Sequence, residues 1–299
     1  MAREVIREDI ATVKHLLLQV LGDENYTDIA RMGGLTNHTY KVTMGDGGEY
    51  VVRIPGPGTE EMIDRSDEMV STRLACDLGV DAPMLYFGKN GSKVTRYIHD
   101  AVTMSSESLK EEARICQMAD IFKTMHSCGQ DTGVPFEVFE MAAGYEKIIF
   151  DKAVPMYSDY DSVKARVMQI KSLVDAACPA KKVPCHNDPL CENWVAGDNR
   201  LYLIDWEYAG MNDGMWDLAD VSIEAGFDTE HDLALLTAYL GQAPQKDQLR
   251  HFLASKIYVD FLWTLWAKAR VPYDGQPMED WATERYTRLK GFIDQYDKL

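Results

Sequence analysis

The sequence contains few basic residues for its size. Lys and Arg total 31 against 48 Asp and Glu, so the 299 residues carry a formal net charge of −17. This balance argues against the basic patch that nucleic-acid binding requires. The acid excess is compatible with a cationic ligand or a Mg²⁺ site, although solubility is the simpler explanation of the charge taken alone.

Cysteine pairs, signal segments and long apolar runs are also missing. The six Cys are scattered and none forms a CxxC pair, so neither a zinc site nor a disulfide framework is expected. Reduced thiols in a cytosol are the simplest account of them. The first ten residues, MAREVIREDI, lack an apolar signal core. No apolar run approaches the roughly 18 residues that a membrane span needs. We therefore expect a cytoplasmic protein without a membrane span.

The first part of the chain is rich in strand patterns, and it contains neither a repeat nor a low-complexity linker. A glycine-led turn, GGLTNH, separates the first two strands, and KNGS forms a hairpin turn between the last two. Apolar residues recur near helical spacing over 59–78, which predicts a helix there. The predicted strands are 26–32, 39–45, 49–54, 83–88 and 93–98.

Helical patterns dominate after Ile98. The first of them, 105–129, opens with Ser residues that are suited to an N-cap and ends at a Gly. Residues 183–208 are the exception, because they read as loop and short strand and carry two acidic motifs. The sequence thus predicts an α+β protein with a small β-rich lobe, 1–98, and a larger mainly helical lobe, 99–299.

The two acidic motifs have the residues that phosphoryl transfer uses. In CHNDPLCEN, Asp188 is followed five residues later by Asn193, which is the spacing of the protein-kinase catalytic loop. In LYLIDW, Asp205 interrupts an apolar run, where an unpaired carboxylate would be costly to bury. A base and hard oxygen ligands for Mg²⁺ are the main protein parts of this reaction. Asp and Asn near Pro most often form turns, but the order and separation of the two motifs favour catalysis.

Five segments together carry a family resemblance. The chain resembles choline kinases, particularly the bacterial type, within the kinase-like phosphotransferases that include ethanolamine kinases and aminoglycoside phosphotransferases. The resemblance runs from about Met32 to the C-terminus. It implies a two-lobed protein-kinase-like fold, with a small antiparallel β lobe with one helix (1–98) that binds nucleotide and a helical lobe (99–299) for catalysis and substrate binding. The segments are GGLTNHTYKV, VVRIPGPGTEEMIDR, CHNDPLCENWV, YLIDWEYAG and DFLWTLWAKAR.

The resemblance assigns roles around the acidic motifs. Asp188 is the expected catalytic base, and Asn193 and Asp205 are the expected Mg²⁺ ligands. Glu207 belongs to the Asp-x-Glu pattern of the family and supports the metal. The expected structural residues are His186, which braces the catalytic loop, His126, which follows a helix, and Asp217, which orders the catalytic loop.

The resemblance also implies how ATP, the co-substrate, is bound. Arg53 stands on the strand where protein kinases place a phosphate-binding Lys, and Arg holds phosphate oxygens well. Glu68 is either the partner that orients Arg53 or an exposed helix carboxylate. Tyr97 and Ile98 are expected in the hinge that meets adenine through backbone groups. The turn expected to cover the phosphates comprises Gly34, Leu35, Thr36 and Asn37.

The acceptor site is expected on the Trp-rich helix. Trp263 and Trp266 are three residues apart and share a helix face, a spacing that by itself favours core packing. Choline kinases, however, place matching Trp residues around the quaternary ammonium, which has no N–H donors and binds aromatic faces. The resemblance adds Glu224 as a carboxylate that faces the substrate. Tyr286 is expected as a third aromatic wall, with Trp281 as the alternative.

These observations predict an ATP- and Mg²⁺-dependent choline kinase that makes phosphocholine. The alternatives are an ethanolamine kinase or another small amino-alcohol or aminoglycoside phosphotransferase. A catalytically inactive kinase-like binding module is disfavoured, because Asp188, Asn193 and Asp205 are all present. The oligomeric state is not predicted.

Overall fold

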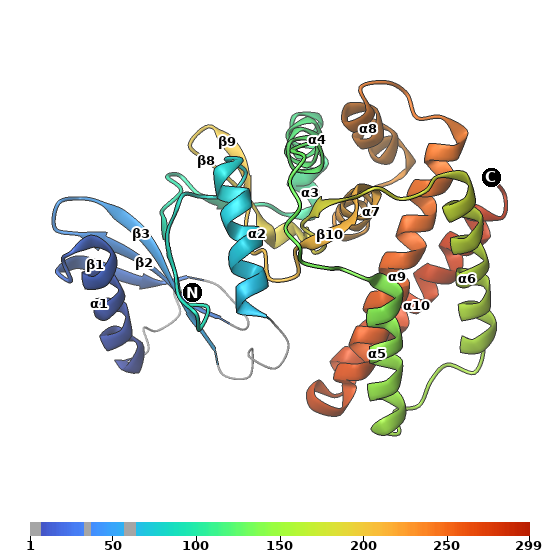
Figure 1. Ribbon diagram of the computed structural model, residues 1–299, viewed down its shortest axis with the longest axis horizontal. Coiled ribbons are helices and arrows are strands. Elements are labelled where there is room, and N and C mark those ends of the chain that lie inside the picture. Colours follow the sequence, from blue (N-terminus) through green and yellow to red (C-terminus); the bar gives the residue numbers. More distant parts are fainter. Residues whose placement is uncertain (1–6, 33–36, 57–63) are drawn as a thin grey trace. The chain divides into compact units, whose positions relative to one another are not determined.

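The computed structural model describes residues 7–32, 37–56 and 64–299, which form two compact units (Figure 1). Unit 1 consists of the described residues up to Met104 together with Glu192–Ala209. Unit 2 consists of Ser105–Cys191 and Gly210–Leu299. The first unit thus runs six residues past the predicted lobe boundary at Ile98 and also includes a later segment of the chain. We retain the assignment of nucleotide binding and catalysis to the two parts of the chain as a proposal.

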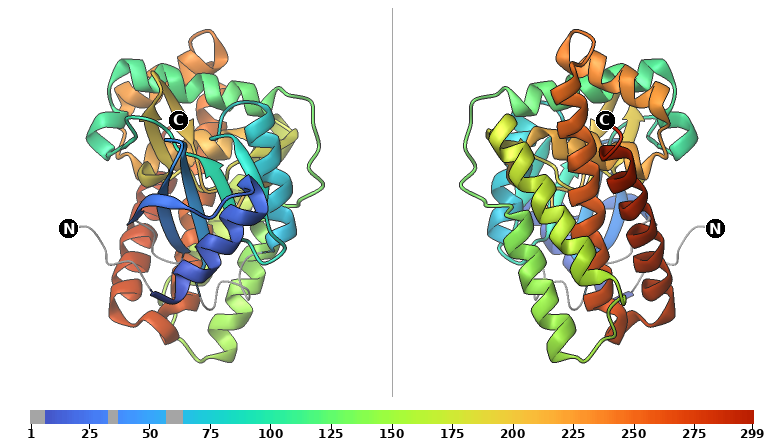
Figure 2. Two further views of the ribbon diagram at one scale, coloured as in Figure 1. Left: turned by 90° about the vertical axis from the view of Figure 1, so that its left-hand side faces the viewer. Right: turned by 90° about the vertical axis from the view of Figure 1, so that its right-hand side faces the viewer.

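Unit 1 is built on a five-stranded antiparallel sheet in the order β1-β2-β3-β5-β4. Strands β1 to β5 lie close to the five predicted segments. Helix α1 packs against this sheet, as Figure 2 (left) shows, because Val13, Leu16 and Leu17 form one buried cluster with strand residues such as Tyr40 and Val52. The elements are α1 (Arg7–Leu21), β1 (Tyr26–Arg31), β2 (Asn37–Met44), β3 (Glu49–Pro55), α2 (Arg65–Asp77), β4 (Met84–Phe87) and β5 (Lys93–Arg96).

The two helices of unit 1 differ from the sequence prediction. Helix α1 was not predicted, although its buried residues Val13, Leu16 and Leu17 have helical spacing. Helix α2 begins at Arg65, whereas the prediction began at 59; residues 57–63 lie outside the described residues. Asp64 sets this start, because its carboxylate accepts the backbone N–H of Ser66 at 2.8 Å and caps the helix.

A second, three-stranded sheet of unit 1 has the order β6-β8-β9 and comprises β6 (Val102–Thr103), β8 (Trp194–Gly197) and β9 (Arg200–Leu203). Strands β8 and β9 pair antiparallel, with Trp194 opposite Leu203. The backbone N–H of Ile204 then bonds the carbonyl of Asn193 at 2.9 Å. Because the pairing continues to this point, Asn193 and Asp205 emerge from the same end of the hairpin.

Unit 2 is mainly helical, and its long helices α5, α6, α9 and α10 run side by side in Figure 2 (right). Helix α9 lies at the centre of this group and is buried over most of its middle turns. The helices are α3 (Ser106–Leu109), α4 (Glu112–His126), α5 (Val138–Asp151), α6 (Tyr160–Ala177), α7 (Gly214–Glu224), α8 (Thr229–Leu240), α9 (Lys246–Asp274) and α10 (Gln276–Tyr296). Strands β7 (Lys182–Cys185) and β10 (Gly210–Asp213) pair antiparallel, and β10 leads directly into α7.

The single helix predicted over 105–129 is two helices in the structure. Ser105 caps the short helix α3 through a reciprocal bond with Ser108, and the chain turns at Lys110 and Glu111 before α4 begins. The N-cap prediction at the Ser residues therefore fits α3, while the long helix begins at Glu112.

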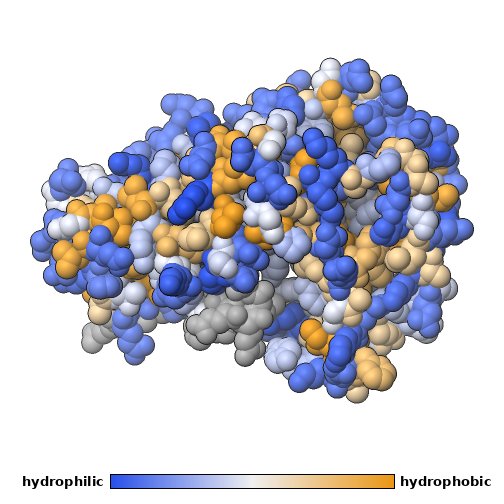
Figure 3. All heavy atoms as spheres, in the orientation of Figure 1, coloured by the Kyte–Doolittle hydropathy of each residue, from blue (hydrophilic) through white to orange (hydrophobic). Residues whose placement is uncertain are grey.

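Hydrophilic side chains cover most of the face drawn in Figure 3, and hydrophobic ones stand there in small groups. This agrees with the 26% of charged residues in the sequence. Among the residues that the structure describes, none of the helices combines the length and apolar character needed to cross a lipid bilayer.

Candidate active site

Arg53 on β3 and Glu68 on α2 form a buried ion pair in unit 1. The Nη2 atom of Arg53 lies 2.6 Å from Oε1 of Glu68, and both side chains are at most 7% exposed. Arg53 also donates to the carbonyl of Gly91 at 2.9 Å. Glu68 is thus not an exposed helix carboxylate, which removes one of the two alternatives for this residue. The role of the pair in phosphate binding stays a prediction.

Arg65, the first residue of α2, joins this pair to Glu207. Its Nη1 donates to Oε2 of Glu68 at 2.6 Å and to Oε1 of Glu207 at 2.8 Å. The same Glu207 oxygen accepts Nδ2 of Asn37 at 2.9 Å. Burial raises the pKa of Glu207, but the bonds from Arg65 and Asn37 outweigh it and hold this pKa below its ordinary value. Sequence reasoning missed Arg65, although Arg65 and Glu68 have the i, i+3 spacing of a helical ion pair.

Asp205 stands directly beyond β9 with an unusual backbone. Its φ of 70° lies in the left-handed region, which non-glycine residues adopt rarely and often at functional sites. Its side chain is 43% exposed and lies 3.8 Å from Nη1 of Arg53. Desolvation of the carboxylate by the surrounding protein and the negative charge of Glu207 raise the pKa of Asp205 to about 6, and the charge of Arg53 opposes this shift.

The carboxylates of Glu68, Asp205 and Glu207 form an acidic cluster. One oxygen of each lies within 4.8 Å of the others. Such a group of hard oxygen donors fits Mg²⁺. Glu68 and Glu207 are already paired with Arg side chains, whereas Asp205 is the most exposed of the three. Asp205 therefore suits direct contact with a cation better than Glu207 does, and the predicted metal-binding roles remain predictions.

In unit 2, Asp217 holds the loop that carries Asp188. Its two carboxylate oxygens accept the backbone N–H groups of His186 at 2.9 Å and Asn187 at 2.8 Å. Trp216 Nε1 donates to the carbonyl of Asn187 at 2.9 Å. Asn187 has a φ of 67°, so these bonds hold a rarely populated backbone conformation immediately before Asp188. The bonds agree with the expected part of Asp217 in ordering this loop.

His126 completes the support of Asp217. Its Nε2 lies 3.1 Å from Oδ2 of Asp217, and its Nδ1 lies 2.9 Å from the hydroxyl of Tyr239. His126, Cys185 and Asp217 could in principle hold a metal ion together, because one potential ligand atom of each lies within 4.8 Å of the others. Burial and the charge of Asp217 raise the pKa of the Cys185 thiol well above its ordinary value, which disfavours the thiolate that a metal would bind. A structural role for His126, as predicted, accounts for these contacts.

Three Trp side chains of unit 2 form a continuous cluster. The ring centroids of Trp263 and Trp266 are 6.2 Å apart, and those of Trp266 and Trp281 are 5.9 Å apart, with edge-to-face geometry in both pairs. Trp263 is only 5% exposed, whereas Trp266 and Trp281 are partly exposed. The indole N–H of Trp266 is buried and has no hydrogen-bond partner among the described residues. The cluster thus combines one core-like ring with two rings that reach the surface.

Tyr286 belongs to a different aromatic pair. Its ring stacks on Tyr157 at a centroid distance of 4.0 Å, and its hydroxyl donates to Oδ1 of Asp159 at 2.9 Å. Of the two expected aromatic walls, Trp281 is therefore the one in contact with Trp266. The assignment of either residue to the substrate stays a prediction.

Glu224, at the end of α7, is paired with an internal cation. Nη2 of Arg285 forms an ion pair with its carboxylate, and Nη1 of Arg285 lies 3.2 Å from Oδ1 of Asp260. Arg288 binds the same Asp260 through two bonds of 2.7 and 2.8 Å. The guanidinium of Arg285 also lies 4.1 Å from the ring centroid of Trp281. Sequence reasoning missed Arg285, because its partners lie far away in the chain.

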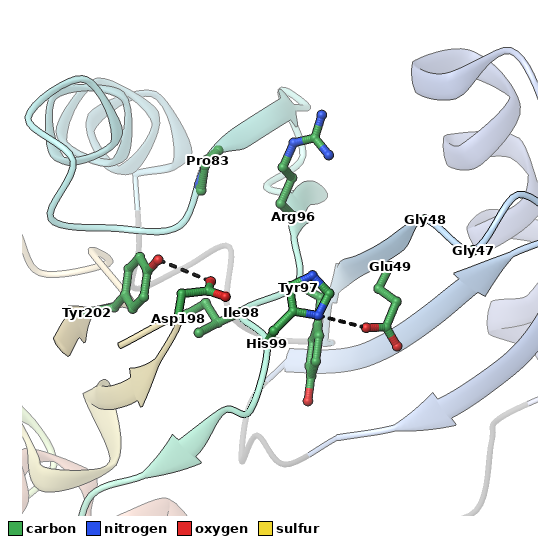
Figure 4. A pocket seen from close by; sticks show the side chains of 10 residues that line it. All are labelled: Gly47, Gly48, Glu49, Pro83, Arg96, Tyr97, Ile98, His99, Asp198 and Tyr202. Carbon is green, nitrogen blue, oxygen red and sulfur yellow. Dashed lines mark hydrogen bonds and ion pairs between the residues drawn. The ribbon is translucent and has the colours of Figure 1, made fainter. Parts of the chain in front are cut away.

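A pocket of about 260 Å³ in unit 1 lies beside Tyr97 and Ile98 (Figure 4). Figure 4 shows the His99 imidazole paired with Glu49, 3.1 Å apart. Ile98 itself packs against Val195 in a small buried cluster. Arg53, Glu68 and Asp205 do not line this pocket, and the expected hinge role of Tyr97 and Ile98 stays a prediction. The lining residues are Gly47, Gly48, Glu49, Pro83, Arg96, Tyr97, Ile98, His99, Asp198 and Tyr202.

The turn predicted to cover the phosphates falls mostly outside the described residues. This applies to Gly34, Leu35 and Thr36, and their assignment stays a prediction. Asn37, at the start of β2, is described and contacts Glu207 as noted above.

Comparisons with known proteins identify a family for this chain. Residues 29–267 match the family described as choline/ethanolamine kinase. A choline/ethanolamine kinase family protein from Mesorhizobium loti superposes with a TM-score of 0.84 at 32% identity, covering 96% of this chain and 94% of the other. The choline kinase LicA from Streptococcus pneumoniae gives a TM-score of 0.79 at 30% identity, covering 96% and 99%. A LicA complex with AMP gives 0.75 at 29% identity, covering 96% and 98%. This likeness confirms the predicted kinase-like fold.

Proposed function

Since this chain belongs to the choline/ethanolamine kinase family, we propose that it transfers the terminal phosphoryl group of ATP to the hydroxyl of choline. The products are phosphocholine and ADP, and the reaction depends on Mg²⁺. The family supports the reaction class, and the likeness to structures described as a choline kinase and as an AMP complex supports choline and an adenine nucleotide as ligands. The remaining support comes from the side chains of the two units.

Arg53 is proposed to bind the phosphate oxygens of ATP. Its guanidinium is always charged and is held in one orientation by Glu68 and the carbonyl of Gly91. A preorganised cation of this kind stabilises the negative charge that is spread over the transferring phosphoryl group. Arg65 supports it indirectly, because it fixes the second oxygen of Glu68.

Asp205 and Asn193 are proposed to hold Mg²⁺. The fit rests on the cluster of three carboxylates and on the exposure of Asp205, and the β8–β9 pairing brings the backbone of Asn193 next to Ile204. When bound, the ion would neutralise charge on the phosphate oxygens. Glu207 is proposed to act indirectly, because its Oε1 is engaged by Arg65 and Asn37.

Asp188 is proposed to orient the choline hydroxyl and to accept its proton. The carboxylate is half-buried and follows a backbone that is fixed by Asp217 and Trp216. A fixed base within reach of the hydroxyl is what general-base catalysis needs. The proton leaves the hydroxyl oxygen for a carboxylate oxygen of Asp188 as the new O–P bond forms and the bond from the γ-phosphorus to the ADP oxygen breaks.

The observation that carries the choice of choline is the cluster of Trp263, Trp266 and Trp281 in the same unit as Asp188. Trimethylammonium is weakly hydrated and gains from aromatic faces, at up to about 2 kcal/mol for a desolvated contact. The primary ammonium of ethanolamine would lose hydrogen bonds to water among such rings. Unpaired donors cost about 1–3 kcal/mol, so we expect choline to lead ethanolamine in kcat/KM by about 10-fold to 100-fold.

The test is a coupled assay of ADP formation with Mg²⁺-ATP and three acceptors: choline, ethanolamine and kanamycin. Choline is expected to give the highest kcat/KM, and kanamycin is expected to give none above the ATPase background. A preference for ethanolamine or kanamycin would overturn the substrate proposal, and no activity with any acceptor would favour an inactive binding module.

A further inference from the structure

Helix α7 presents three carboxylates along one side. Asp217, Asp220 and Glu224 follow each other at i, i+3 and i+7, a spacing that places them on one helix face. Asp217 holds the loop at His186 and Asn187, and the thiol of Cys191 donates to the carbonyl of Glu224 at 3.5 Å. The loop that carries Asp188 therefore runs along α7, and Asp220 lies between the two attachment points.

Two of the three carboxylates are already compensated. Asp217 accepts two backbone N–H groups and contacts His126. Glu224 pairs with Arg285, and Arg285 and Arg288 share Asp260. The two guanidinium groups of Arg285 and Arg288 thus balance the two carboxylates of Glu224 and Asp260. Glu224 alone cannot supply the counter-charge of a cationic substrate.

Asp220 is different. It is completely buried, and neither of its carboxylate oxygens has a hydrogen-bond partner among the described residues. The charges that act on it most strongly come from three elements: Glu224 and Asp217 on α7, Asp188 on the loop, and Arg285 on α10. Three of these four are acidic. A charged carboxylate without a partner is unfavourable in such surroundings, so burial favours the neutral form of Asp220.

We propose, on the basis of the proposed function, that Asp220 determines specificity by supplying the negative charge that compensates the ammonium group of the substrate. The choline hydroxyl has to reach Asp188, and the ammonium is only two carbons away from it, so the cation enters the field of Asp220. The O–H bond of Asp220 then breaks, its proton passes to the solvent, and the carboxylate that remains faces the ammonium. Trimethylammonium cannot donate hydrogen bonds, and an unpaired carboxylate is suited to a purely electrostatic contact of this kind.

Burial and the charges of Glu224, Asp188 and Asp217 raise the pKa of Asp220 well above its ordinary value, with Arg285 acting in the opposite direction. A bound cation stabilises the ionised form and lowers this pKa. Binding of choline is therefore expected to be accompanied by release of a proton from Asp220, and binding is expected to become tighter as the pH rises through the range in which Asp220 titrates.

The first test uses the unmodified enzyme. Choline is titrated calorimetrically into enzyme saturated with Mg²⁺ and a non-hydrolysable ATP analogue, in two buffers of different ionisation enthalpy at pH 7. The difference in heat gives the number of protons released. Measurable proton release is expected for the parent, and a value near zero is expected for Asp220→Asn. No release from the parent, or unchanged release from Asp220→Asn, would overturn the proposal.

The second test compares choline with 3,3-dimethylbutan-1-ol, which has the same shape without the charge. Asp220→Asn is expected to raise KM for choline by at least about 10-fold and to leave KM for the neutral alcohol within about 2-fold. Asp294→Asn removes the same charge at an exposed position of α10 and is expected to change neither value. An unchanged preference for choline in Asp220→Asn would overturn this inference alone, whereas a parent enzyme that does not phosphorylate choline would overturn the proposed function.

Discussion

Arg65 and Glu207 are 2.8 Å apart across unit 1, and their bond ties the start of α2 to the segment that follows β9. The same Arg65 nitrogen lies 2.6 Å from Glu68, the partner of Arg53. One guanidinium thus connects the proposed phosphate-binding Arg to the proposed metal-binding motif. Both members of the Arg65–Glu207 pair are at most 9% exposed, so loss of either charge leaves the other buried without compensation.

Replacement of Arg65 by Met is therefore expected to destabilise the protein by about 3–5 kcal/mol, the usual cost of breaking a buried ion pair from one side. Arg65→Lys is expected to retain part of the stability, because a single ammonium cannot follow the forked geometry of a guanidinium. Urea unfolding measures the free energy of unfolding of both variants. Arg73→Met, at an exposed position of the same helix, is the matched control. Equal free energies of unfolding for Arg65→Met and Arg73→Met would show that the ion pairs of Arg65 do not stabilise the protein.

Asp205→Asn is expected to abolish turnover, mainly because the charged oxygen ligand of Mg²⁺ is lost. Asn193→Ala is expected to have a smaller effect, since it removes a neutral ligand. Initial rates over a range of Mg²⁺ concentrations distinguish weak metal binding, which excess Mg²⁺ restores in part, from loss of fold. Turnover of Asp205→Asn close to that of the parent at ordinary Mg²⁺ would rule out this assignment.

Asp188→Asn is expected to lower kcat by roughly 10²-fold or more, the scale of general-base loss. ATP binding is expected to survive, because the proposed contact of Asp188 is with the acceptor hydroxyl. Steady-state kinetics give kcat, and a nucleotide titration of the same preparation gives the Kd for ATP. If nucleotide binding disappeared while the fold stayed intact, Asp188 would belong to the nucleotide site.

Trp266→Ala and Trp281→Ala are expected to raise KM for choline far more than KM for ATP, and to narrow the preference for choline over ethanolamine. Both rings are partly exposed, so these variants lose less core packing than Trp263→Ala would. Tyr273→Ala removes a 65% exposed aromatic ring near the end of α9 and is the control. If both Trp variants had the KM for choline of the parent, the Trp cluster would have only a structural role.

Local patterns predicted much of this fold. The strand segments of the first hundred residues and the N-cap at Ser105 depend on neighbours in the sequence, and the structure contains them. Helix α1 has the same kind of local signal in Val13, Leu16 and Leu17, although it is not among the expected elements. The break before Glu112 is harder to foresee, because strong helix-forming residues continue across it.

The parts of the candidate site that could not be predicted are the long-range pairs. Arg65 meets Glu207 across 142 residues, and Arg285 meets Glu224 across 61. A single Arg at either position carries no local signal of its partner, and only the folded chain brings the charges together. The same is true of Asp220, whose lack of partners is a property of its surroundings and not of its spacing.

The most direct measurement of the proposed kinase activity is a ³¹P NMR time course of the enzyme with Mg²⁺-ATP and choline. We expect phosphocholine and ADP to accumulate in equal amounts, and neither to form with Asp205→Asn or without Mg²⁺. Consumption of ATP that yields inorganic phosphate and no phosphocholine, in the presence of saturating choline, would contradict the proposed activity.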